Sequence, residues 1–213
     1  MEKPNKNAPP VSPDSDTGAK ILTAARAEFA RYGLAGGRVD RIAADAGVNK
    51  AMIYYHFRSK ENLYFEAVAS VLKEAAGSIS GLADSHDSLE SLLVAIADFY
   101  ASLFARQPEF RAIILHELAN PDSTLLKQLG DQFVVSGVPA KLLARLEREQ
   151  AAGNIRELDL RQTLISFILM QVGYFMMAPM VNRILNVNEI DRFIEQRKTA
   201  VVDLFLNGVR RKA

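Results

Sequence analysis

The 213-residue sequence contains no cysteine, which excludes a disulfide framework, a thiolate metal site and a cysteine nucleophile. This absence fits a protein of the reducing cytoplasm, which is where we expect it to act. No stretch alternates apolar and polar residues as β-strands do, and no such pair of stretches flanks a hairpin turn. Apolar residues recur at spacings of three and four, which predicts an all-α fold of about nine helices.

Signals of catalysis are also missing. There is no glycine-rich phosphate loop, no zinc-type His/Glu spacing and no credible Ser/His/Asp arrangement. His116 and Glu117 in the run LHEL lack the second histidine of a zinc protease. We therefore predict a protein that is not an enzyme and that holds neither a metal nor a cofactor.

Charge and proline are unevenly distributed along the chain. Residues 1–60 hold ten Lys/Arg against six Asp/Glu, a net charge of +4, whereas residues 61–213 have a net charge of −3. A basic N-terminal region on a mildly acidic body favours a nucleic-acid partner at one end. Four of the eight prolines fall within residues 1–16, which carry no apolar segment typical of a secretory signal and are predicted to form a disordered tail.

Residues 17–63 are predicted to form a three-helix DNA-binding domain. The first helix spans 17–32, with Leu22, Phe29 and Tyr32 on its apolar stripe and Glu28 mostly away from it. Short helices at 39–46 and 50–57 follow, joined by a turn at Gly47. Asn49 is placed to cap the second of them.

The exposed face of the helix at 50–57 predicts contact with double-stranded DNA. Lys50 can donate to guanine and Ala51 can touch a thymine methyl group, so these two are the expected base contacts. Contact with phosphate is expected from the polar and cationic residues around them, with His56 at the edge: Arg38, Asn49, Tyr54, Tyr55 and Lys60.

The runs AARAEFARYG, VDRIAADAGV and IYYHFRSKENL resemble the N-terminal domain of the TetR family of transcriptional regulators. The resemblance covers roughly residues 17–72. It departs from the family at Arg38, where a small Ser or Thr is common. It implies a homodimeric repressor, whose last two helices pair with those of a partner, bound to a palindromic operator and released by a small effector.

The body, residues 64–213, is predicted to bind the effector and to dimerise. Its expected helices include a fourth that continues towards Gly77, one long helix at 123–153 that bends near 137–139, one that follows Asp159 and one at 189–212. The helix after Asp159 is apolar almost all round, so both its faces must be buried. Gln171, Gly173 and Pro179 leave it an apolar run of only about fifteen residues, too short for a membrane span.

Two sets of residues in the body are expected to contact partners, one the effector and the other a second subunit. An apolar or aromatic effector is expected to contact a set of aromatic, methionine and polar side chains: Phe99, Tyr100, Phe104, Phe110, His116, Phe133, Met170, Gln171, Tyr174 and Met177. The expected dimer interface draws on the last two helices: Phe167, Ile168, Phe175, Ile190, Phe193, Ile194, Val201, Leu204 and Phe205.

Two alternatives stay open at this point. The same scaffold could serve as a protein-binding adaptor, or as an activator without ligand-induced release. Lys50→Ala with Tyr54→Ala distinguishes the adaptor, because these changes should abolish DNA binding and leave contacts with a protein partner intact.

Overall fold

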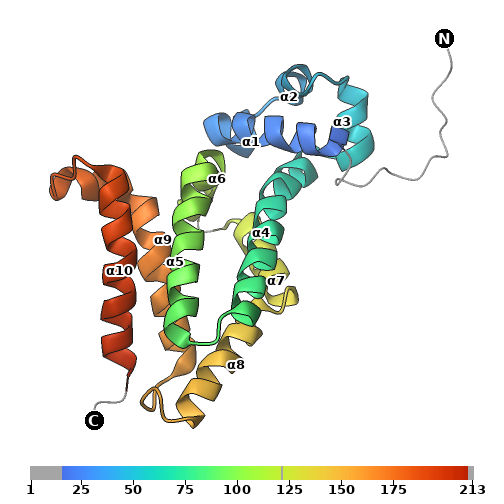
Figure 1. Cartoon of the computed structure of the whole chain (residues 1–213). Coiled ribbons are helices and arrows are strands. Elements are labelled where there is room, and N and C mark those ends of the chain that lie inside the picture. The colour runs from blue at the N-terminus through green and yellow to red at the C-terminus, as the bar shows by residue number, and fades with distance from the viewer. Residues whose placement is uncertain (1–15, 121, 211–213) are drawn as a thin grey trace. The chain divides into compact units, whose positions relative to one another are not determined.

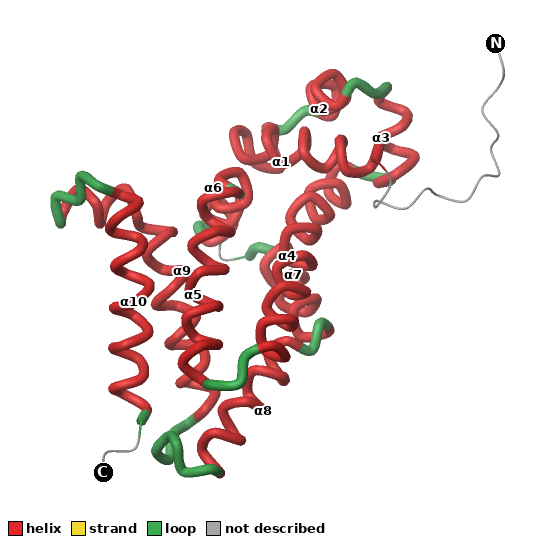
Figure 2. Tube along the Cα trace, viewed as in Figure 1, coloured by secondary structure: helices red, strands yellow, loops and turns green. Residues whose placement is uncertain are grey.

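The computed structural model describes residues 16–120 and 122–210, and helices make up nearly all of them (Figures 1 and 2). Apart from an isolated bridge between Ile155 and Arg210, this part of the chain holds no strand, which confirms the all-α prediction. The predicted disordered tail lies outside the described residues except for Asp16, which begins the first helix. The ten helices are α1 Asp16–Gly36, α2 Val39–Ala46, α3 Lys50–Phe57, α4 Lys60–Ser85, α5 Leu89–Arg106, α6 Pro108–Leu118, α7 Thr124–Val135, α8 Val138–Ala151, α9 Leu160–Ile184 and α10 Ile190–Val209.

The predicted single helix at 123–153 is wrong, because the chain breaks it into α7 and α8. Gly137 has a φ of 74°, a left-handed conformation that ends one helix before the next begins. Pro139 follows in the first turn of α8, where its missing N–H group costs nothing. Two other helices are longer than predicted: α4 continues past Gly77 to Ser85, and α9 continues through Pro179 to Ile184.

The chain divides into two compact units. The first holds residues up to 71 together with 109–127, and the second holds 72–108 together with residues from 128 onward. The three N-terminal helices therefore pack with the start of α4, with most of α6 and with the first turn of α7. Helix α4 is continuous from the first unit into the second.

The core of the first unit is built from the inner faces of four helices. Fully buried side chains from each of them meet there: Ile21, Ala25, Phe29, Ile42, Ile53, Phe57 and Leu63. The ring of Phe29 packs edge-on against Tyr64 of α4 at 4.9 Å between centroids. Tyr32, predicted as part of this stripe, is instead 49% exposed and lies under the guanidinium of Arg41 at 4.4 Å.

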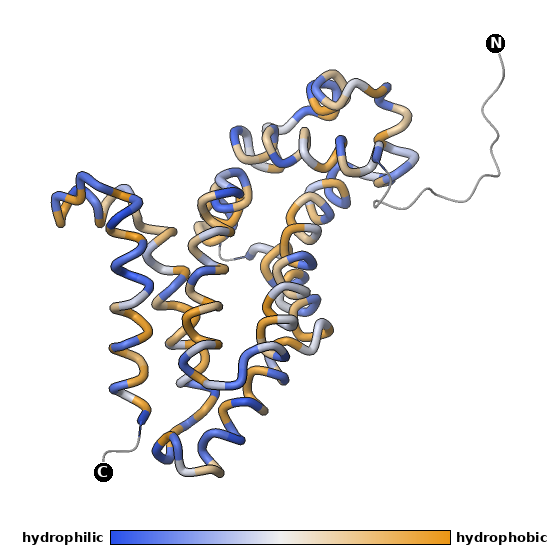
Figure 3. The backbone as a smooth tube through the Cα atoms, in the orientation of Figure 1, coloured by the Kyte–Doolittle hydropathy of each residue, from blue (hydrophilic) through white to orange (hydrophobic). Residues whose placement is uncertain are grey.

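The second unit is a bundle in which α5 packs against α9 and α10. Apolar residues recur along these three helices (Figure 3). Aromatic rings link them, since Phe104 of α5 stacks on Phe175 of α9 at 5.0 Å, and Tyr174 of α9 meets Phe193 of α10 at 5.5 Å. Helix α8 is attached by Arg145, whose guanidinium donates to the carbonyl oxygens of His86 and Asp87 in the loop before α5.

Candidate nucleic-acid interface

The turn between α2 and α3 is closed by backbone hydrogen bonds. Gly47 has a φ of 66°, and its N–H donates to the carbonyl of Ala44 at 3.2 Å. The N–H of Val48 donates to the carbonyl of Ala43 at 3.0 Å. These two bonds form a Schellman motif, which satisfies the last carbonyls of α2 and fixes the direction in which α3 leaves.

Helix α3 has one buried face and one exposed face. The Oδ1 atom of Asn49 accepts the N–H of Met52 at 2.8 Å, so Asn49 is the N-cap that the sequence predicts. Ile53 and Phe57 are each 1% exposed, whereas Tyr54 and Tyr55 are 42% and 41% exposed. The exposed aromatic and basic side of this short helix is therefore available to a partner.

Lys50, the first residue of α3, forms an ion pair with Asp40 of α2. The Nζ and Oδ1 atoms are 2.9 Å apart, and both side chains are about half exposed. The hydrogen bond and the charge of Lys50 lower the pKa of Asp40, and Asp40 in turn raises the pKa of Lys50. An expected base contact thus already has a partner in the protein.

Lys60 is also engaged within the chain. Its Nζ donates to the carbonyl oxygen of Ala35, at the end of α1, at 3.2 Å. An ammonium group has three donors, so two remain for phosphate. By contrast, Arg38 is exposed and its side chain makes no hydrogen bond or ion pair within residues 16–120 and 122–210.

A buried carboxylate replaces the side-chain cap that α2 lacks. Glu28 of α1 is 5% exposed and accepts the backbone N–H of Arg38 at 2.7 Å and the Nε–H of Arg41 at 2.8 Å. Burial pushes the pKa of Glu28 up, but these bonds and the charges of Arg41 and Arg31 outweigh it, so the pKa is lowered. The carboxylate also faces the positive end of the α2 dipole, which favours its charged form.

This cluster corrects the sequence prediction that Glu28 lies away from the apolar stripe of α1. Its partner Arg41 also donates to the carbonyl of Gly36 at 3.2 Å and stacks on Tyr32, so one guanidinium joins α2 to the second half of α1. The cluster explains why Arg38 needs no small hydroxyl side chain, since Glu28 binds the backbone at that position.

Arg58 follows α3 in a strained backbone conformation that the sequence does not signal. Its φ is 64° and its ψ is −45°, and the N–H of Ser59 donates to the carbonyl of Phe57 at 2.7 Å. These values define a γ-turn of the rare, strained kind. The Arg58 side chain is exposed and makes no hydrogen bond or ion pair within the described part of the chain.

Comparison with known proteins identifies this helical unit. Residues 21–67 match the family described as "Bacterial regulatory proteins, tetR family". The transcriptional repressor NicS of Pseudomonas putida is 30% identical over 201 residues, which cover 90% of this chain and 91% of NicS. The chain belongs to the TetR family. It is therefore a DNA-binding transcriptional repressor of the helix-turn-helix type, in a family of regulators rather than enzymes.

One further relative and one solved structure also resemble this chain. The repressor SCO4008 of Streptomyces coelicolor is 35% identical over 101 residues, which cover 47% of this chain and about half (49%) of SCO4008. Among solved structures, FadR of Bacillus subtilis in complex with stearoyl-CoA has a TM-score of 0.73. It is 19% identical, and the match covers 90% of this chain and 99% of that one, a likeness that shows the fold alone.

The structure does not bring the ten predicted effector-contacting residues around one cavity. Phe110 and His116 belong to the first unit, and the other eight belong to the second. Tyr100, Phe104 and Tyr174 are at most 9% exposed and pack in the aromatic core between α5, α9 and α10. Burial raises the pKa of the Tyr100 hydroxyl to about 12. Phe133 lines a cavity of about 560 Å³ in the second unit, and Met170 lines a separate one of about 390 Å³.

That cavity lies between the second half of α4 and the end of α7. Its apolar wall comes from Leu72, Ala76, Phe133 and Val135, and Gly77 leaves open space beside it. Polar side chains complete the lining: Lys73, Ser80, Asp131, Gln132 and Ser136.

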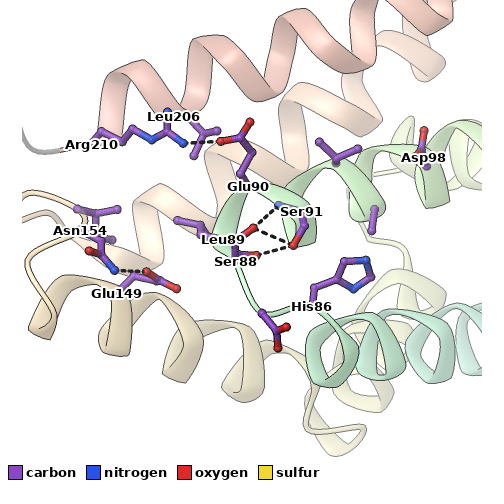
Figure 4. A pocket seen from close by; sticks show the side chains of 14 residues that line it. His86, Ser88, Leu89, Glu90, Ser91, Asp98, Glu149, Asn154, Leu206 and Arg210 are labelled. Atoms are coloured by element: carbon purple, nitrogen blue, oxygen red, sulfur yellow. Dashed lines mark hydrogen bonds and ion pairs between the residues drawn. The ribbon is translucent and has the colours of Figure 1, made fainter.

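A larger cavity, about 1060 Å³, lies where the start of α5 meets the ends of α8 and α10 (Figure 4). Several of its charged side chains are joined to one another or to nearby groups. Arg210 contacts Glu90 at 2.5 Å, and Asn154 donates to Glu149 at 2.8 Å. Ser88 caps α5 by accepting the N–H of Ser91. These bonds tie helix ends together and pair the carboxylates of Glu90 and Glu149 within the protein.

The predicted dimer residues divide into two groups, which differs from the expectation of one shared surface. Phe167, Phe175, Val201 and Phe205 are at most 7% exposed, because they face the interior of their own unit, where Phe167 and Phe205 pack at 4.8 Å. Ile168, Phe193 and Ile194 are half-buried, and Ile190 and Leu204 are exposed. The opposite side of α9 carries exposed apolar side chains that were not predicted: Ile165, Leu169, Met180 and Ile184.

Helix α9 is long and apolar enough to cross a membrane by length and composition, although the sequence predicted too short an apolar run. Only 22% of its most apolar window is buried in the chain. Its buried side carries the polar residues Thr163 and Gln171, and the TetR relationship identifies a regulator. The exposed apolar side of α9 therefore remains to be buried by a partner other than the described part of this chain.

Proposed function

We propose that this protein is a cytoplasmic, homodimeric repressor that binds a palindromic operator and is released by a small apolar or aromatic effector. The observation that carries this proposal is the exposed face of α3, held at a fixed angle by the capped turn and flanked by cations. The family relationship supplies the repressor class. The residues that contact DNA, the dimer and the effector site are proposed in addition to that class.

We assign the DNA contacts to residues on or beside the exposed face of α3. Lys50 and Ala51 face base edges, and Tyr54 and Tyr55 bind phosphate through their hydroxyl groups. Asn49 uses its Oδ1 as a cap and keeps its amide N–H groups for phosphate. Phosphate contact also falls to the cations at the two ends of the recognition helix and to the histidine at its edge: Arg38, His56, Arg58 and Lys60.

The exposed side of α9, together with Leu204 of α10, forms the proposed dimer surface. Ile165, Leu169, Met180 and Ile184 are 46–66% exposed, and the spacing of these four residues puts them on one stripe of the helix. A two-fold axis through this stripe would present two recognition helices to successive major grooves, about 34 Å apart. A palindromic operator follows from that symmetry.

The effector site is proposed in the cavity between α4 and α7. Its volume of about 560 Å³ lies within the range of small-molecule sites, and its apolar wall with a few polar groups suits an apolar or aromatic compound. The fold shared with a FadR that was solved with stearoyl-CoA supports the choice of an apolar ligand. A ligand here contacts α4, so it can lower DNA affinity by as much as it prefers the non-binding state.

The DNA-binding proposal is tested by selecting duplexes from a random library with the purified protein. A palindromic consensus and a steep fall in affinity with rising salt are expected, because several phosphates are neutralised. Binding without sequence preference, or a partner protein captured in its place by an adaptor, would refute the operator.

The effector site is tested with Gly77→Leu. The new side chain enters the open space beside Gly77 and fills the cavity, so compounds that release the wild-type protein from its selected duplex should no longer do so, while DNA binding stays intact. Gly81→Leu is the matched control, because Gly81 lies one turn further along α4, also faces open space and does not line this cavity. Release that persists in Gly77→Leu would place the effector elsewhere.

A further inference from the structure

The ion pair between Asp40 and Lys50 puts a carboxylate next to a residue proposed to contact DNA. Asp40 is in the first turn of α2 and Lys50 begins α3, so the pair spans the two helices of the motif. The side chains of Lys50 and Asp40 are 48% and 60% exposed, and an exposed pair of this kind contributes little to stability. Asp40 therefore contributes little to stability, and its main effect falls on a partner that Lys50 contacts.

Phosphate and guanine respond differently to this pair. A phosphate drawn to Lys50 brings a negative charge close to the carboxylate of Asp40, which opposes it. The O6 and N7 atoms of guanine are uncharged acceptors, and an ammonium group with three donors can reach them while it keeps its bond to Asp40. The carboxylate thus penalises sequence-independent contact more than it penalises guanine contact.

We propose that Asp40 is a specificity-determining residue, which keeps Lys50 from acting as a general phosphate contact and reserves it for a base edge. This inference rests on the proposed DNA-binding function and adds a role for a residue that lies outside the set of contacts. Arg38 is the other charged group that acts on both members of the pair, and its exposed guanidinium, which makes no hydrogen bond or ion pair among the described residues, can reach phosphate.

The test compares Asp40→Asn with the wild type on two duplexes of equal length, the selected operator and a scrambled sequence. Affinity for the scrambled duplex should rise about 3- to 10-fold and affinity for the operator clearly less, so the ratio of the two falls. Asp45→Asn is the matched control, because it removes the same charge from the same exposed helix without contact to Lys50. It should change both affinities by the same small factor.

A second background isolates the contact. In Lys50→Ala, adding Asp40→Asn should no longer change the ratio, since the lysine that Asp40 restrains is gone. Equal effects of Asp40→Asn and Asp45→Asn, or a loss of operator affinity alone in Asp40→Asn, would overturn the proposal. Failure of the proposed function is a separate result, because wild-type protein would then bind both duplexes equally. Thermal melting of each variant excludes misfolding.

Discussion

Arg58 combines a strained backbone with an exposed charge. A γ-turn conformation with positive φ costs a residue with a Cβ atom about 1–3 kcal/mol, and glycine would adopt it more easily. The Arg58 side chain makes no ion pair with any residue that the structure describes, so its guanidinium, next to α3, is placed for an external partner.

Arg58→Gly is therefore expected to change stability and binding in opposite directions. The free energy of unfolding should rise by about 1 kcal/mol as the strain is relieved. Affinity for the selected duplex should fall, with a salt dependence lower by about one ion, since one phosphate contact is lost. Urea unfolding and binding titrations at several salt concentrations measure the two effects.

Arg58→Ala separates them, because it loses the cation and keeps the Cβ atom. It should reproduce the weaker binding without the gain in stability. Unchanged salt dependence in both variants would contradict a phosphate contact.

Glu28 makes the stability of the first unit depend on pH. Its folded-state pKa is lowered, so its contribution to stability is complete above the unfolded pKa and is lost as pH falls through the folded value. Glu28→Gln should lower the free energy of unfolding at pH 7 by about 1.5–3 kcal/mol, because charge-assisted bonds to Arg41 are lost. The difference from wild type should shrink as the pH is lowered, and a difference that stays constant from pH 7 to 3 would contradict this.

At the scale of single residues, the sequence predicted the features that depend only on residues close by in the chain. The cap by Asn49 and the turn at Gly47 follow from local chemistry, and both are found. Glu28 was misjudged because its partners come from another helix, 10 and 13 residues further on, and the periodicity of α1 holds no information about them. The strain at Arg58 could not be predicted either, since only glycine signals positive φ in a sequence.

At the scale of elements, three helices of the first unit are joined through one carboxylate. Glu117 of α6 accepts the hydroxyl of Tyr64 of α4 at 2.7 Å and that of Ser123, just before α7, at 2.5 Å. Tyr64 is 3% exposed and its ring packs on Phe29, so the bonds connect α6 and α7 to the core of the DNA-binding helices. Burial and the bond to Glu117 raise the pKa of Tyr64, which keeps its hydroxyl protonated.

Tyr64→Phe removes the donor and keeps the ring. The carboxylate of Glu117 is then left with one of its two partners, and we expect a loss of about 1–3 kcal/mol in the free energy of unfolding. Chemical denaturation measures it. In the double variant with Glu117→Ala, which removes the acceptor, the two losses should not add, because both changes break the same bond. Full additivity would show that the bond contributes nothing.

The division between α7 and α8 shows what periodicity misses among elements. Apolar spacing continues across 123–153, so the pattern favours one helix with a bend. The outcome depends on the backbone of Gly137, which takes a left-handed φ, and a glycine inside an apolar pattern does not by itself show whether a helix bends or ends. Gly77 and Gly81 in α4 illustrate the opposite case, since both stay helical.

At the scale of the whole molecule, the sequence predicted that α9 is apolar on both sides but not which side faces the interior of its own unit. A helix that is apolar all round must bury both of its sides, and only one side of α9 is buried within the described part of the chain. Periodicity cannot tell which side faces inward, because both sides of α9 are apolar. Phe167 and Phe175 proved to face inward, and the stripe through Leu169 remained exposed.

Leu169→Glu tests whether that stripe pairs two subunits. Leu169 is 58% exposed, so the substitution should leave the fold of each subunit intact while placing two like charges near a two-fold axis. Sedimentation velocity should show a monomer where the wild type is a dimer, and affinity for the full palindrome should fall towards that for a half-site. Leu118→Glu is the matched control, since Leu118 is also 58% exposed but belongs to α6 in the first unit. It should remain a dimer. If Leu169→Glu sediments as the wild type does, then the pairing surface must lie elsewhere, and the exposed apolar side of α9 would need a different partner.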